Sequence, residues 1–128
     1  MFDIDKTTTE LENNGVWVTF REGKFLIAHT NNMVFQRTFT RLQAPHRKRL
    51  EKGTLDPKIQ LDTMCKAMAK GILLDWKNVS SKGKKYPYSE EAAYALLLHN
   101  SELREFVQDT ALDLENYRSE EIEELGES

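Results

Sequence analysis

The sequence predicts a mainly α protein, a small helical domain of about four to five helices with a short N-terminal β-hairpin. Two observations carry this prediction. Two runs of β-branched and aromatic residues lie within about 16–29, and from residue 31 onward apolar residues recur at helical spacing between start and stop signals. The chain has 128 residues, 39% of them hydrophobic, which is enough to bury one modest core. We expect one domain over 1–118 and an acidic, flexible tail over 119–128.

The hairpin is predicted from residues 16–20 and 24–29, whose side chains favour extended backbone. Arg21-Glu22-Gly23 connects the two runs, and we expect Gly23 to take the positive-φ position of the turn. An isolated hairpin is only marginally stable in water. Its apolar face should therefore pack on the helices that follow.

The next segment predicts a helix capped by Asn31 or Asn32. Proline crowds a helix and removes a backbone donor, so we expect a kink or break near Ala44-Pro45. Gly53 should end this helical region. Its apolar positions are Phe35, Phe39, Leu42 and Leu50.

Asp56-Pro57 predicts the start of a second helix, with an aspartate cap and a proline in the first turn. Apolar residues at helical spacing extend this helix to Trp76, and the basic residues 80–85 after it predict a flexible loop. The apolar stripe is Leu61, Met64, Cys65, Met68, Ile72 and Trp76.

Two more helices are predicted beyond the loop. Ser89 can cap a short helix that is apolar on nearly every side over 92–98, and another helix should begin at Ser101. One face of the last helix carries an acidic row, Glu102, Glu105, Asp109 and Asp113.

Charge is strongly segregated along the chain, although the formal net charge is only −3. Residues 37–85 hold 13 Lys/Arg and 4 Asp/Glu, whereas residues 86–128 hold 2 Lys/Arg and 12 Asp/Glu. The two regions can neutralise each other within one domain, or each can face a partner of opposite sign. Composition alone leaves both possibilities open.

Several functional classes are disfavoured. The apolar runs fall short of the roughly 20 residues of a membrane span, and the first residues lack a signal-peptide pattern, so a cytosolic protein is expected. The three histidines have no metal-ligand spacing, and no pattern places one beside Cys65, the single cysteine, which lies on an apolar stripe. The acidic row resembles a solvated helix face more than a pair of catalytic carboxylates. We therefore expect no enzyme activity, metal or cofactor. A further hypothesis is a thiol enzyme that uses Cys65, which predicts that Cys65→Ser abolishes activity.

The segment 37–52, with Arg47-Lys48-Arg49 at its centre, carries the strongest signal for nucleic-acid binding. A regulatory or connector protein associated with nucleic acid is therefore the alternative function. Against it, the chain is acidic overall and lacks a recognised nucleic-acid motif. A solvated or intersubunit face explains the same cations.

Two sets of residues are candidates for protein contacts. The first is an apolar set that belongs first to the core but exceeds what a small domain covers easily: Trp76, Leu96, Leu97, Leu98 and Phe106. The second is a charged set for self-association, in which basic residues of one copy contact acidic residues of the next. Such head-to-tail contacts build rings or open helices. Its members are Arg37, Arg41, Arg47, Lys48, Glu102, Glu105, Asp109 and Asp113.

The order of several short motifs resembles the tail assembly chaperones of long-tailed, siphovirus-type bacteriophages, in their shorter, non-frameshifted form. The resemblance covers most of the chain, and none of its motifs is catalytic. It lies in Gly15-Val16-Trp17-Val18, Arg41 to Arg47, Gly53-Thr54-Leu55-Asp56, Leu73-Leu74-Asp75-Trp76, Tyr86-Pro87-Tyr88-Ser89, Leu103 to Val107 and Leu114 to Arg118.

The resemblance implies a mostly helical protein of the host bacterial cytoplasm. Such a protein binds the aggregation-prone tape measure protein, keeps it soluble and recruits major tail protein during virion assembly. It also implies a homo-oligomer that is absent from the mature virion, and in many members a second, longer form made by ribosomal frameshifting. None of these implications involves a membrane or a cofactor.

Overall fold

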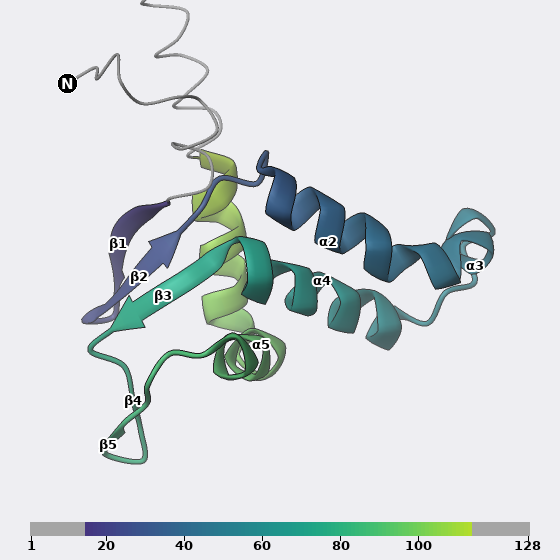
Figure 1. Cartoon of the computed structure of the whole chain (residues 1–128). Coiled ribbons are helices and arrows are strands. Elements are labelled where there is room, and N and C mark those ends of the chain that lie inside the picture. Colours follow the sequence, from purple (N-terminus) through teal and green to yellow (C-terminus); the bar gives the residue numbers. More distant parts are fainter. Residues whose placement is uncertain (1–14, 114–128) are drawn as a thin grey trace, which may run out of the picture.

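The computed structural model describes residues 15–113, and in them a three-stranded antiparallel sheet in the order β1-β2-β3 packs against helices (Figure 1). Strands β1 (Val16–Phe20) and β2 (Gly23–Ile27) form the expected hairpin, and β3 (Leu73–Lys77) pairs with the other edge of β2. The protein is therefore a small α/β domain, and the prediction of a mainly α fold was wrong.

Strand β3 was not predicted, because its residues were expected to form the end of a helix. Ile27 of β2 pairs with Leu73 and Leu26 with Asp75, so Leu74 is an extra residue in β3, a β-bulge. The bulge places Leu73 and Trp76 on the same buried face although they are three residues apart. That spacing is also the spacing of a helix face, so the pattern favoured the wrong structure.

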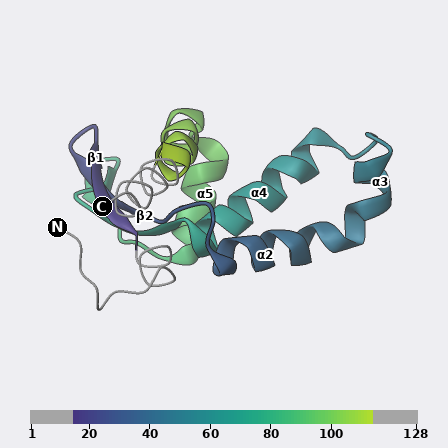
Figure 2. The same ribbon diagram turned by 90° about the horizontal axis from the view of Figure 1, so that it is seen from above.

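A helical arm leaves the sheet between β2 and β3. It consists of α2 (Met33–Gln43), a 3-10 turn (Ala44–His46), α3 (Arg47–Glu51) and α4 (Pro57–Gly71). Figure 2 shows α2 and α4 running side by side, with α3 at the end of the arm that is remote from the sheet. The expected break at Ala44-Pro45 is confirmed, because α2 ends there and its direction changes.

The predicted helix starts are confirmed where the structure describes them. The side chain of Asn32 accepts a hydrogen bond from the first turn of α2, Asp56 does the same for α4, and Ser89 does so for α5 (Glu90–His99). The last helix begins at residue 101 and is described to residue 113. Its cap is Asn100, whose side-chain oxygen accepts from the backbone N–H of Leu103 at 3.1 Å.

The core lies between the inner face of the sheet and the helices α4, α5 and 101–113. Phe20 of β1 stacks on Phe106 of the last helix with ring centroids 4.5 Å apart, which fixes that helix against the sheet. The buried members of this core include Phe25, Ile27, Cys65, Met68, Ile72, Leu73, Trp76, Leu97, Leu103 and Val107.

Two turns differ from the expectation. In the first hairpin the positive-φ residues are Arg21 and Glu22, not Gly23, which is buried at the start of β2. The expected flexible loop at 80–85 is a second small hairpin, β4 (Ser80–Ser81) and β5 (Lys84–Lys85). Positive φ angles at both central residues of its turn, Lys82 and Gly83, match the twist that a two-residue hairpin loop requires.

Among the described helices, none has both the length and the apolar character to cross a lipid bilayer. The acidic tail expected at 119–128 lies outside the described residues, as does the motif Leu114 to Arg118.

Candidate functional site

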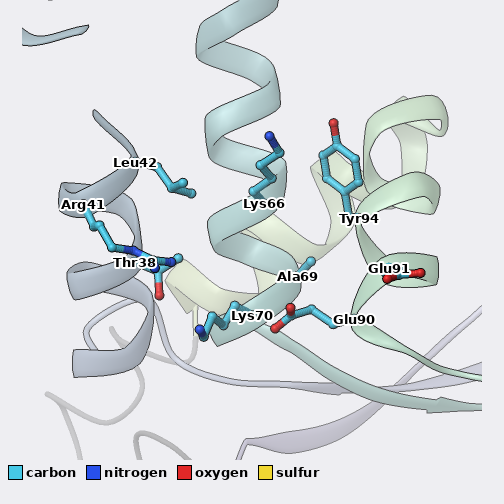
Figure 3. A pocket seen from close by; sticks show the side chains of 9 residues that line it. All are labelled: Thr38, Arg41, Leu42, Lys66, Ala69, Lys70, Glu90, Glu91 and Tyr94. Atoms are coloured by element: carbon cyan, nitrogen blue, oxygen red, sulfur yellow. The ribbon is translucent and has the colours of Figure 1, made fainter. Parts of the chain in front are cut away.

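A groove crosses α4 between α2 and α5, and it is the candidate site (Figure 3). Its hollow measures about 260 Å³. Helix α4 forms the floor, because it packs against both α2 and α5. The lining residues are Thr38, Arg41 and Leu42 of α2, Lys66, Ala69 and Lys70 of α4, and Glu90, Glu91 and Tyr94 of α5.

The base of the arm is held by a close approach of α2 to the end of α4. The buried side chain of Asn32 accepts from the backbone N–H of Phe35 at 2.9 Å and donates to the carbonyl of Gly71 at 3.0 Å and to that of His29. A Cβ on Gly71 would lie 2.6 Å from backbone atoms of Phe35, so only glycine permits this packing. These contacts set the separation of the two groove helices α2 and α4.

One end of the groove contains a polar network that joins α4 to α5. The Tyr94 hydroxyl donates to a carboxylate oxygen of Asp62, and the Lys66 ammonium lies 3.0 Å from the other oxygen and 5.8 Å from the Tyr94 ring centroid. The hydrogen bond to the Asp62 carboxylate raises the pKa of Tyr94 to about 12, with burial adding to the shift. The same hydrogen bond, with help from Lys66 and against the effect of burial, lowers the pKa of Asp62. Both groups thus keep their ordinary ionisation at neutral pH.

The groove carries opposite charges on its two sides. Arg41 and Lys70 lie on the arm side, and Glu90 and Glu91 lie in the first turn of α5, where acids are favourable to the helix dipole. None of these four forms an ion pair with another described residue. Their charges are therefore available to a partner with an opposite arrangement.

The basic residues proposed for self-association all lie on the arm and are exposed. Between residues 33 and 71 there are nine Lys/Arg and three Asp/Glu, and Lys66 is the arm cation with an ion pair in the described part of the chain. Arg41 faces the groove, and the remaining members lie along α2 and near the tip of the arm: Arg37, Arg47 and Lys48.

The acidic residues proposed for self-association are exposed on helix 101–113. Glu102 forms an ion pair with Arg21 of the first hairpin at 2.5 Å. Glu105, Asp109 and Asp113 form none within residues 15–113. The structure therefore does not bring the arm cations and the acidic row together within one molecule.

The apolar residues proposed for partner binding lie in or against the core. Trp76 and Leu97 are buried, and the Trp76 indole N–H donates to the Tyr86 carbonyl at 2.7 Å. Leu96, Leu98 and Phe106 are half-buried and pack against the core. In this conformation Trp76, which is 5% exposed, offers little surface to a partner, and Leu97 offers none. Large apolar side chains that are exposed are Val16, Trp17, Met33, Val34, Leu50 and Leu112.

Cys65 lies in the core with no exposed surface, and burial raises the pKa of its thiol. A nucleophilic cysteine needs the thiolate, which this environment disfavours at neutral pH. Within the described residues no three potential metal ligands converge.

Of the residues that line the groove, Arg41 was predicted from the sequence to take part in protein contacts, and most of the others were not. The separation of Arg41 from Glu90 along the chain leaves no local pattern that links them, because the link depends on how α2 and α5 flank α4. Asp62 and Lys66 have the i,i+4 spacing that brings two residues together on one face of a helix. Tyr94 as the third member of their network becomes apparent only in the fold.

The structure is thus a small α/β protein with a charged groove lined by three helices. A family model described as YdaY prophage protein matches residues 30–127. The chain therefore belongs to this prophage protein family and is of phage origin. Comparison with curated proteins and with solved structures gives no match.

Proposed function

We propose that this prophage protein is a tail assembly chaperone, which binds the tape measure protein, keeps it soluble and helps to recruit major tail protein. Phage origin supports the proposal, together with the order of motifs that resembles such chaperones. The matched residues 30–127 include the arm, the groove and the acidic helix, so every surface in the argument belongs to the family region.

The observation that carries the proposal is the separation of positive and negative surface charge onto different parts of the molecule. Exposed cations lie on the arm and exposed acids on helix 101–113, and no described ion pair joins the two sets. Complementary surfaces on different faces favour head-to-tail contacts between copies. A row of such copies can bind a long helical protein with an avidity that no single copy has.

Co-expression with the tape measure protein of the same prophage tests the proposal. We expect the tape measure protein to move from the pellet to the soluble fraction and to co-purify with this chain. A tape measure protein that stays insoluble and does not co-purify would contradict the function. As a tail assembly chaperone, the protein acts in the host cytoplasm and is absent from the mature virion.

Self-association is tested by light scattering over a salt series. Contacts between Arg47 or Lys48 of one copy and the acidic row of the next should give oligomers that dissociate as salt rises. The charge reversal Lys48→Glu should weaken them, and a reversal of Asp109 to lysine should restore them. A monomer at every concentration and salt would exclude this arrangement.

The unpaired cations of the arm also favour a second candidate, a regulatory or connector protein that binds nucleic acid. Such a protein binds random duplex DNA with an affinity that falls steeply with salt, because counterions are released on binding. Titration with labelled duplex DNA at several salt concentrations distinguishes the two. Absence of binding at low salt favours the chaperone.

A further inference from the structure

The groove across α4 has the form of a docking site for a helix. Its walls are two helices that flank a third, and its floor at Ala69 is small and almost completely buried. A small floor residue lets an approaching side chain sink close to the backbone of α4. A hollow of about 260 Å³ fits one or two side chains of a partner.

The charges on the walls specify the chemistry of that partner. Arg41 of the α2 wall and Lys70 at the end of the floor helix α4 present positive charge, and Glu90 and Glu91 of the α5 wall present negative charge (Figure 3). None of the four is neutralised by a described residue, while the neighbouring Lys66 already pairs with Asp62. A partner thus needs an acidic flank toward the arm and a basic flank toward α5.

Between the charged walls the groove offers apolar contact. Leu42 and the Tyr94 ring, both half-buried, stand on either side of Ala69. The Tyr94 hydroxyl is already used by Asp62, so the ring itself is the surface that the groove presents. An apolar anchor between two charged flanks is the pattern of an amphipathic helix laid in a groove.

We propose that this groove docks an amphipathic helical segment of the tape measure protein. The segment places carboxylates against Arg41 and Lys70, Lys or Arg against Glu90 and Glu91, and one apolar side chain over Ala69. The inference rests on the proposed function, and it adds which surface is used and what sequence chemistry it selects.

Charge reversal tests the groove in the full-length protein. The double variant R41E/K70E should reduce the co-purified tape measure protein about tenfold, because two attractive contacts become repulsive. The matched control is K84E/K85E, which makes the same change of net charge on exposed positions of β5, outside both the arm and the groove, and should change capture less than about twofold. Circular dichroism and thermal unfolding establish that both variants fold.

Photo-crosslinking gives a second measurement that does not depend on charge. A photoreactive phenylalanine analogue at Leu42, inside the groove, should crosslink to the tape measure protein, and the same analogue at Leu50, at the tip of the arm, should not. Mass spectrometry of the Leu42 product should identify a helical segment with acids on one flank and bases on the other.

The outcomes separate the inference from the function. If the wild-type protein captures the tape measure protein but R41E/K70E captures it equally well, the groove is not the site and the chaperone function stands. Crosslinks from Leu50 alone, or from Leu42 to a second copy of this chain, also overturn the inference. If the wild-type protein captures nothing, the proposed function itself fails.

Discussion

The sheet end of the molecule and the far end of the arm differ in how many of their residues are buried. Strands β2 and β3 bury most of their inner face against α4, α5 and helix 101–113, with aromatic rings around Trp76. Helix α3 at the tip of the arm has no buried residue, and α2 has one, Thr38. In α4 the buried residues begin at Thr63 and continue to Gly71, toward the sheet.

The difference indicates how the arm is supported. Its tip contributes little apolar burial, so the position of the arm depends on its base, where Asn32, Gly71 and the seam between α4 and α5 fix it. The exposed cations near the tip therefore contribute little to the stability of the fold. Substitutions should therefore cost most in the sheet, less at the base of the arm and least at the tip.

The largest effect is expected at the sheet. Trp76→Ala removes the ring that contacts Phe25, Tyr86 and Tyr88, and should lower the free energy of unfolding by about 4 kcal/mol. The control is Trp17→Ala on the exposed outer face, where the ring is 40% exposed and lies 4.6 Å from the Lys77 ammonium. That change should cost about 1 kcal/mol. Urea denaturation followed by circular dichroism measures both, and equal costs would contradict the comparison.

The base of the arm should come next. Asn32→Ala removes a helix cap and leaves the buried carbonyls of Gly71 and His29 without their donor, so we expect a loss of about 3 kcal/mol. Ser89→Ala removes an exposed cap alone and should cost about 1 kcal/mol. Urea denaturation of the two variants side by side tests the difference. If they cost the same, Asn32 is only a cap and does not hold the arm.

The close contact between α2 and α4 predicts whether the change Gly71→Ala stabilises or destabilises the protein. In a free helix, alanine in place of glycine is stabilising by about 1 kcal/mol. Gly71→Ala should instead destabilise by about 2 kcal/mol, because its Cβ meets Phe35 backbone atoms at 2.6 Å. Gly53→Ala is the control for backbone strain alone, since its φ is +69° and no atom lies within 4 Å. A Gly71→Ala protein more stable than wild type would show that the helices do not approach so closely.

Features set by a few neighbouring residues were predictable, and features set by distant contacts were not. The caps Asn32, Asp56 and Ser89 and the break at Ala44-Pro45 follow from local hydrogen bonding and proline sterics. Strand β3 was missed because its bulge imitates helical spacing. The groove was missed because it joins α2, α4 and α5, which only tertiary packing brings together.

The seam between α4 and α5 should give a small effect, similar to the loss of an exposed helix cap, and the clearest dependence on pH. Tyr94→Phe removes the hydrogen bond to Asp62 and should cost about 1 kcal/mol at pH 7. In the folded protein the pKa of Tyr94 is raised to about 12 from 10.0, so this stabilisation is complete below pH 10 and is lost as the pH rises toward 12. The pKa of Asp62 is lowered from 3.8, so the same stabilisation is also lost as the pH falls below about 4.

Urea denaturation of wild type and Tyr94→Phe at pH 3, 7 and 11 measures this dependence. The difference in unfolding free energy should be greatest at pH 7 and smaller at both extremes, because either protonation of Asp62 or ionisation of Tyr94 weakens the pair. A Tyr94→Phe difference that is the same at all three pH values would mean that the seam between α4 and α5 is held by packing of the ring alone.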